Sequence, residues 1–151
     1  MSNTQAMCTS FKGEILSGVL ALGTTVTRAT TTADTLKAAL YLASATVNAA
    51  TTAYSATGEV SGTGYSAGGV TVTNATAPTT SGTTGYWTPS ASITYTTVTL
   101  TTAFDCVLIY NSTQSNKAIS VHTFGSQTVT AGTFTLTMPT NDASNALIRI
   151  A

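Results

Sequence analysis

Alternating apolar and polar positions run along most of this chain and predict β-strands. The clearest case is a hairpin in which Phe104–Tyr110 pairs with Ala118–Phe124 across a turn at Asn111–Asn116. Asn and Ser side chains favour such turns because they hydrogen-bond to the nearby backbone. The stretches Val70–Asn74 and Ile93–Leu100 carry the same alternation and predict two more strands.

The C-terminal third continues this pattern. It predicts strands at Gln127–Thr130, Thr133–Met138 and Leu147–Ile150. Turns at Ala131–Gly132 and Asn141–Ala143 separate them, because Gly, Asn and Asp are typical turn residues. The C-terminal part is therefore expected to consist of short strands joined by tight connections.

Two segments need a choice between helix and strand. Asp34–Ala45 contains good helix formers, but its Leu residues alternate with polar and small positions and it leads into a β-branched tail, so we predict a strand. Phe11–Ser17 predicts a short helix, capped by Ser10 and ended by Gly18. The Thr-, Ser- and Gly-rich stretch Thr76–Gly85 predicts an exposed loop.

Short strands separated by turns every 8–12 residues or so are typical of sandwiches and barrels. The predicted fold class is all-β: an antiparallel β-sandwich, jelly-roll-like or Ig-like, with a short N-terminal helix. The length of 151 residues suits a single domain. Within residues 1–151 we expect residues 1–33 to form an N-terminal arm with the helix and a loop, and residues 34–151 to form the β core.

The composition removes several classes of function. Only 7% of the residues are charged and the net charge is zero, so the clustered Lys and Arg of a nucleic-acid binder are missing. No stretch has the length of a membrane helix, and Met1–Ser10 does not resemble a secretory signal. About a quarter of the chain is Thr, and a neutral, charge-poor β-domain tends to associate, so we expect a homo-oligomer.

The chain has one His and two Cys, which predicts no metal site and no cofactor. Cys106 alternates with large apolar residues and is expected to be a buried thiol. A Cys8–Cys106 disulfide is the alternative that the sequence leaves open. His122 alternates onto the face of Ala118 and Phe124, and we expect it to face solvent or an interface.

A glycine-rich segment contains two formal motif matches. Gly62-x-Gly64-x-x-Ala67 fits a loose dinucleotide fingerprint, which requires a helix to follow. Gly64–Gly68 fits the nucleophile elbow, with Ser66 as nucleophile and Asp105 and His122 following in the order of a hydrolase triad. Both motifs need a helix, whereas a β-branched run follows here. We therefore interpret the segment as a glycine-rich turn before a strand and predict no enzyme and no catalytic residues.

Aromatic residues beside Thr and Ser loops are the remaining candidates for recognition. Tyr54, Tyr65, Tyr86 and Trp87 are the residues that we predict to anchor an interface. Ordinary packing in the core or at its rim is the alternative for each of them.

The most specific string in the sequence is Glu59–Gly69, which reads Glu-Val-Ser-Gly-Thr-Gly-Tyr-Ser-Ala-Gly-Gly. It is accompanied by Cys8–Lys12, Asp34–Tyr41, Thr51–Tyr54, Leu108–Ser112, Ser115–Ala118 and Ala146–Ala151. Together these stretches resemble a family of small structural proteins encoded by tailed bacteriophages. The resemblance spans nearly the whole chain, and Gly23–Ala33 is the segment that departs from it.

This resemblance implies a virion component without enzymatic activity. The expected role is a capsid decoration or cement protein that binds the major capsid protein or other virion proteins, assembled in the host cytoplasm and then carried on the virion. The reducing cytoplasm suits two Cys residues without a bridge. The alternative is a tail, collar or fibre protein that recognises a host surface through Tyr86 and Trp87.

Overall fold

Two antiparallel sheets and one short helix build the fold, which confirms the predicted all-β sandwich. The computed structural model describes residues 3–16, 20, 22, 33–74 and 76–151. The strands are β1 (Ala6–Met7), β2 (Leu36–Leu42), β3 (Val70–Thr71), β4 (Thr79–Ser81), β5 (Thr84–Trp87), β6 (Ile93–Asn111), β7 (Lys117–Leu136) and β8 (Ile148–Ile150), and the helix is α1 (Thr9–Leu16). One sheet has the order β1-β7-β6-β2-β3 and the other β4-β5-β8.

One long hairpin dominates the larger sheet. β6 has 19 residues and β7 has 20, and they pair from Asn111 with Lys117 near the turn to Ile93 with Leu136 at the open end. The sequence pattern predicted separate short strands here, and that prediction was wrong, because bulges join the pieces into two continuous strands. The turn expected at Ala131–Gly132 is a distortion within β7.

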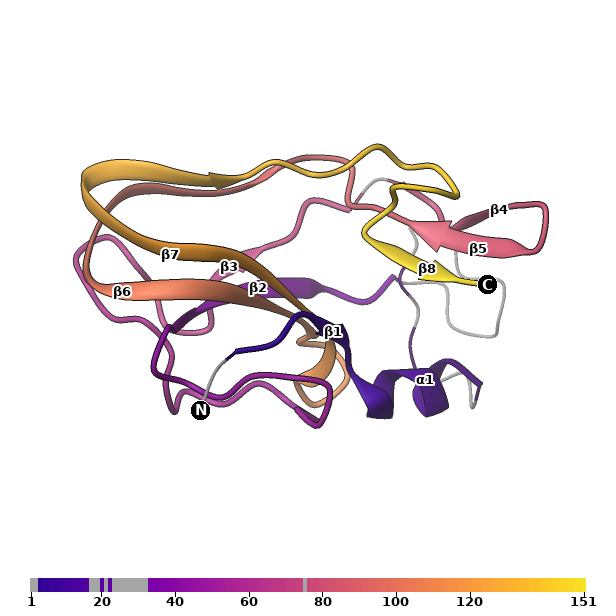
Figure 1. Cartoon of the computed structure of the whole chain (residues 1–151), viewed down its shortest axis with the longest axis horizontal. Helices are drawn as coiled ribbons and strands as arrows, with labels where there is room; N and C mark the ends of the chain where they lie inside the picture. Colours follow the sequence, from indigo (N-terminus) through magenta and orange to yellow (C-terminus); the bar gives the residue numbers. More distant parts are fainter. Residues whose placement is uncertain (1–2, 17–19, 21, 23–32, 75) are drawn as a thin grey trace.

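The hairpin doubles back on itself, as Figure 1 shows at its left edge. The start of β6 and the end of β7 therefore form an upper layer above their own other halves. The register shifts repeatedly between Tyr95 and Cys106, and Thr97, Gly125 and Ala131 have positive φ near the bend. Bulges of this kind bend a strand and increase its twist.

An aromatic cluster fills the space inside the bend. The ring of Phe134, on the upper half of β7, lies edge-on to Phe104 with centroids 5.0 Å apart. It also lies 5.1 Å from the ring of Phe124, on the lower half of β7. These contacts tie the two layers together, because edge-to-face aromatic pairs are favourable beyond the area that they bury.

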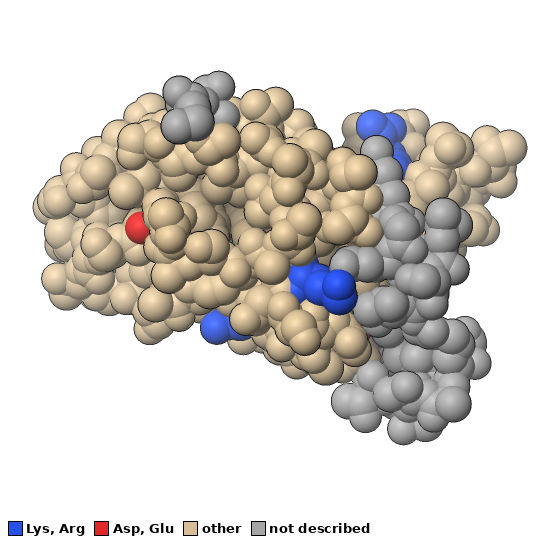
Figure 2. All heavy atoms as spheres, turned by 90° about the horizontal axis from the view of Figure 1, so that it is seen from below, with Lys and Arg blue, Asp and Glu red and all other residues tan. Residues whose placement is uncertain are grey.

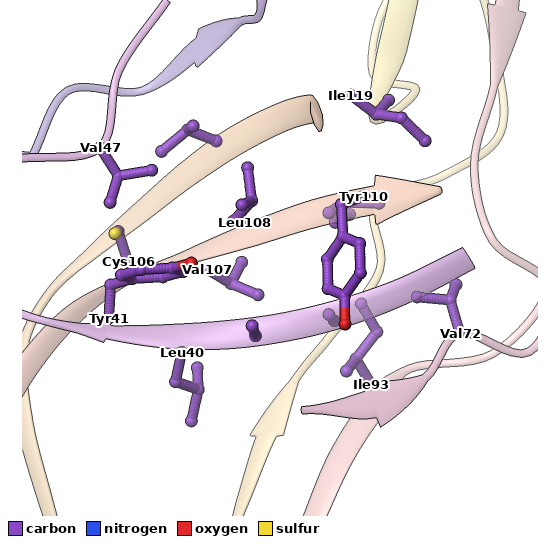
Figure 3. Packing of buried hydrophobic residues seen from close by; sticks show 14 of the residues in the cluster. Leu40, Tyr41, Val47, Val72, Ile93, Cys106, Val107, Leu108, Tyr110 and Ile119 are labelled. Carbon is purple, nitrogen blue, oxygen red and sulfur yellow. The ribbon is translucent and has the colours of Figure 1, made fainter. Parts of the chain in front are cut away.

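β2 is an inner strand of the larger sheet, between β6 and β3. Leu36, Ala38, Leu40 and Tyr41 are all nearly inaccessible, so both faces of the strand are covered. Figure 3 shows Leu40 and Tyr41 on opposite sides of the β2 ribbon. This double burial explains why the sequence of β2 is almost continuously apolar and resembled a helix.

The N-terminal residues are part of the packed structure. β1 adds to the edge of β7, where Ala6 pairs with Val121. α1 begins at Thr9, earlier than the predicted Phe11, and Phe11 is fully buried. The predicted Gly18 cap lies outside the described residues. The predicted loop at Thr76–Gly85 was wrong in part, because β4 and β5 form a hairpin there, but its exposure was right for residues 77–83.

Candidate functional site

The glycine-rich segment packs backbone against backbone on two strands. Isolated bridges join Tyr41 to Glu59 and Thr63 to Thr99. A Cβ atom at Gly64 would overlap the carbonyl oxygen of Thr97, and one at Gly69 would overlap that of Ala38. The glycines are therefore explained by the close approach of the loop to β6 and β2.

The chain then enters β3 at Val70 directly, without a helix. This confirms the interpretation of the segment as a glycine-rich turn before a strand. It also means that Ser66 does not lie on the strand-to-helix turn that a nucleophile elbow requires.

The Glu59 carboxylate holds this loop in place. Its Oε2 accepts a hydrogen bond from the Tyr54 hydroxyl at 2.6 Å, and its Oε1 accepts from the Tyr65 hydroxyl and from the Gly68 N–H, each at 2.8 Å. The Tyr65 oxygen in turn accepts from the backbone N–H of Leu40 at 3.0 Å. One carboxylate thus connects two tyrosines and the loop backbone to β2.

The surrounding tyrosines are arranged as stacked pairs. Tyr54 stacks on Tyr110 with ring centroids 4.8 Å apart, and Tyr65 stacks on Tyr95 at 5.9 Å. Burial raises the pKa of Tyr54 and Tyr65 far above the ordinary value, and the hydrogen bond to Glu59 is the second largest cause. Both phenols therefore remain protonated donors, and each commits its hydroxyl proton to an internal bond.

Trp87 and Tyr86 lie in the smaller sheet. Trp87 is 2% exposed, and its indole N–H donates to Asn74 Oδ1 and to the carbonyl oxygen of Thr76. Tyr86 is half-buried beside an apolar hollow of about 310 Å³ between α1, β5 and β8. Interface anchoring by Tyr54, Tyr65, Tyr86 and Trp87 stays a prediction, and the ring of Trp87 belongs to the core of the single chain.

The three residues of the formal triad do not form one site. Ser66 is exposed on the loop, Asp105 accepts a hydrogen bond from Asn3 Nδ2, and His122 Nε2 lies 2.9 Å from Ser120 Oγ. No hydrogen bond among the described residues joins Ser66, Asp105 and His122.

His122 is half-buried, so it does not face open solvent, and the alternative that it faces an interface stays a prediction. It lines a groove of about 740 Å³ between the two layers of the folded hairpin. Val107 and Phe124 also line this groove, and so do Leu136 and Met138. Burial lowers the pKa of His122 from 6.5 to about 4. This groove could not be predicted from the sequence, because its lining residues come from segments that are distant along the chain.

Both cysteines are buried and no disulfide joins them, which answers the question that the sequence left open and confirms the burial of Cys106. Burial raises the pKa of the Cys106 thiol to about 12, with a smaller contribution from Asp105. A protonated, buried thiol is unreactive. Within the described residues, no group of three or more His, Cys, Asp and Glu side chains could hold a metal ion, and no helix is long and apolar enough to cross a membrane.

Comparisons of the chain with known protein families, with curated proteins and with solved structures found no match.

We expect Gly69→Ala to destabilise the fold far more than Gly82→Ala. Both glycines have positive φ, at 69° and 57°, so both variants incur the roughly 1–2 kcal/mol strain of the left-handed region. No heavy atom lies within 4 Å of a Cβ at Gly82, whereas a Cβ at Gly69 meets the Ala38 carbonyl. Urea unfolding should show a loss above about 3 kcal/mol for Gly69→Ala. Equal losses in the two variants would contradict the packing described here.

We expect Glu59→Gln to lower the free energy of unfolding by about 2–3 kcal/mol, because the amide keeps one acceptor oxygen and turns an N–H₂ group toward a donor. Asp142→Asn is the matched control. Asp142 also accepts several hydrogen bonds, but within an exposed turn, so its substitution should have a much smaller effect. Both variants are compared by urea unfolding at pH 7. A Glu59→Gln variant as stable as wild type would exclude the anchoring role.

Stability should depend on pH through His122. Its pKa is lower in the folded chain than in the unfolded chain, so the unfolded state binds more protons between about pH 6.5 and pH 4. The free energy of unfolding should therefore fall across this window as the pH is lowered, by on the order of 2 kcal/mol. The His122→Gln variant should lack this contribution. Parallel pH profiles for wild type and variant would show that His122 titrates normally.

Proposed function

We propose that this chain is a structural protein of a tailed-bacteriophage virion, a capsid decoration or cement protein that binds the assembled head. The observation that carries the proposal is the use of its few charged groups. The carboxylates of Asp34, Glu59, Asp105 and Asp142 all accept hydrogen bonds from within the chain. Those charges hold the fold together instead of standing as isolated ionic contacts for a partner.

The surface left for contact is accordingly polar but uncharged. On the face drawn in Figure 2, atoms of Lys, Arg, Asp and Glu are few and scattered. All three residues of β4 and most of the bend of β7 are exposed Thr, Ser, Gly, Gln and Ala. Such a surface binds through backbone hydrogen bonds, hydroxyl groups and apolar burial, which suits a permanent contact on a large assembly.

The resemblance to small structural phage proteins supports the same role. A protein that binds the assembled shell and not its loose subunits stabilises the shell by mass action. The major capsid protein is the proposed partner. The proposed mechanism needs no catalytic group and no cofactor, only a rigid body with a fixed contact surface.

The test is the copy number of the chain in purified particles, measured by quantitative mass spectrometry against the major capsid protein. We expect a simple whole-number ratio to the shell subunit. We also expect the chain to stay bound when salt is raised to about 1 M, because screening weakens charge pairs and leaves apolar contacts unaffected.

Three outcomes would contradict this proposal. A small copy number set by the neck or tail would favour the tail, collar or fibre role, and absence from the particle would remove the virion role. Release at high salt would show that the contact is ionic. A capsid protein of known high copy number in the same preparation serves as the internal standard.

A further inference from the structure

Along most of its length, the outer edge of β7 has no neighbouring strand among the described residues. β1 pairs with β7 only at Val121 and Ser120. From His122 to the end of β7 at Leu136, no strand among the described residues borders this edge. The backbone N–H and C=O groups that point away from β6 therefore have no strand partner within the described chain. An edge of this kind is a template for a strand from another chain.

The other edges of the two sheets are protected. The outer strands β1, β3, β4 and β8 have only two or three residues each, and short edge strands are a common defence against unwanted pairing. In the upper layer, the outer edge of β6 is covered by the glycine-rich loop, which bridges Thr63 to Thr99 and packs Gly64 on the carbonyl of Thr97. The exposed edge of β7 is the exception.

That edge also lacks protective side chains. From His122 to Met138 the sequence contains no Lys, Arg, Asp, Glu or Pro, the residues that usually block edge pairing. Distortions at Gly125 and Ala131 interrupt the edge near the bend. After them, Thr133–Leu136, which we call the β7 end segment, is regular: its last three residues pair with Ile93–Tyr95 without a shift.

Exposed and half-buried side chains alternate along the β7 end segment, as they do in a strand within a sheet. Thr133 and Thr135 are exposed, while Phe134 and Leu136 are half-buried. Among the described residues, β6 and β7 are the only strands of the upper layer here, and a two-stranded ribbon is marginal without further cover. Leu136 also lines the groove of about 740 Å³, so apolar surface lies beside the unpaired backbone. An added strand would widen the layer and cover this side of the groove.

We propose that the β7 end segment pairs antiparallel with the same segment of a second copy of this chain. The two upper layers then join into one four-stranded sheet across a two-fold axis. A second copy fits because the segment is uncharged and the chain has zero net charge, so nothing repels an identical edge. The contact is isologous: it uses both edges and closes as a dimer, not as an open fibre. It stands whether or not the chain is a virion protein.

The test is sedimentation velocity of the isolated full chain over a range of concentrations. Wild type should sediment as a dimer that dissociates on dilution. In the Thr133→Lys/Thr135→Lys variant, the dimer dissociation constant should rise by at least about tenfold, because two exposed lysines on each edge repel their copies. The control is Thr57→Lys/Thr140→Lys, which adds the same charge at exposed positions outside β7 and should dimerise like wild type.

A monomeric wild type at every concentration would overturn the proposal, and so would equal dimerisation of the two double variants. Circular dichroism checks that both variants fold. If the β7 variant does not fold, hydrogen exchange of wild type decides: slower exchange of Thr133–Leu136 amides at higher protein concentration supports the pairing. Exchange of these amides that is independent of concentration overturns it.

Discussion

The fold depends on the need of one long hairpin to bury its own apolar face. A two-stranded ribbon exposes both of its faces to water, and β6 and β7 together account for most of the larger sheet. The ribbon doubles back on itself and so buries one of its faces, and Phe104 and Phe124 contact Phe134 across the bend. The bulges and positive-φ residues at the bend provide the curvature, and the aromatic cluster makes the folded-back form stable.

The two layers are also held from outside the hairpin. The glycine-rich loop lies against the upper part of β6 and against β2, and Glu59 fixes it there through two tyrosine hydroxyls and one backbone N–H. Tyr65 links both layers, because it stacks on Tyr95 of the upper layer and accepts from Leu40 of the lower one. A half-buried carboxylate with several donors is a strong and directional anchor.

The scarcity of charge connects the fold with its proposed roles. The described carboxylates serve internal bonds, and the exposed strands carry Thr instead of Lys or Glu. An ordinary soluble domain uses charged residues to keep its edges apart. A protein that stays bound to an assembly does not need charged residues to keep its edges apart, and an uncharged edge can then pair with another chain. The uncharged edge of β7 and the neutral outer surface both follow from the low content of charged residues.

The sequence by itself determined the class of the fold and most strands of the larger sheet, but not β1 or the hairpin of β4 and β5. Alternation marked the strands of the lower hairpin, and β-branched residues after Asp34 favoured a strand over a helix, because these signals depend on local geometry. The β-branched run after Gly69 also ruled out an elbow. Only the tertiary structure decided that five predicted strands are two. Bulges are set by contacts across the sheet and leave no clear mark in the sequence.

The observed site differs from the predicted one for the same reason, because it depends on contacts between residues that are distant along the chain. The sequence predicts Tyr54 and Tyr65 as interface anchors because they are aromatic. Their hydrogen bonds to Glu59, however, depend on a loop that returns to β2 from outside the sheet. The groove beside His122 and the unpaired edge of β7 arise from the bend, which brings together residues that are distant along the chain. The local pattern therefore predicted most of the strands, and long-range packing decided which of their edges and faces remain open.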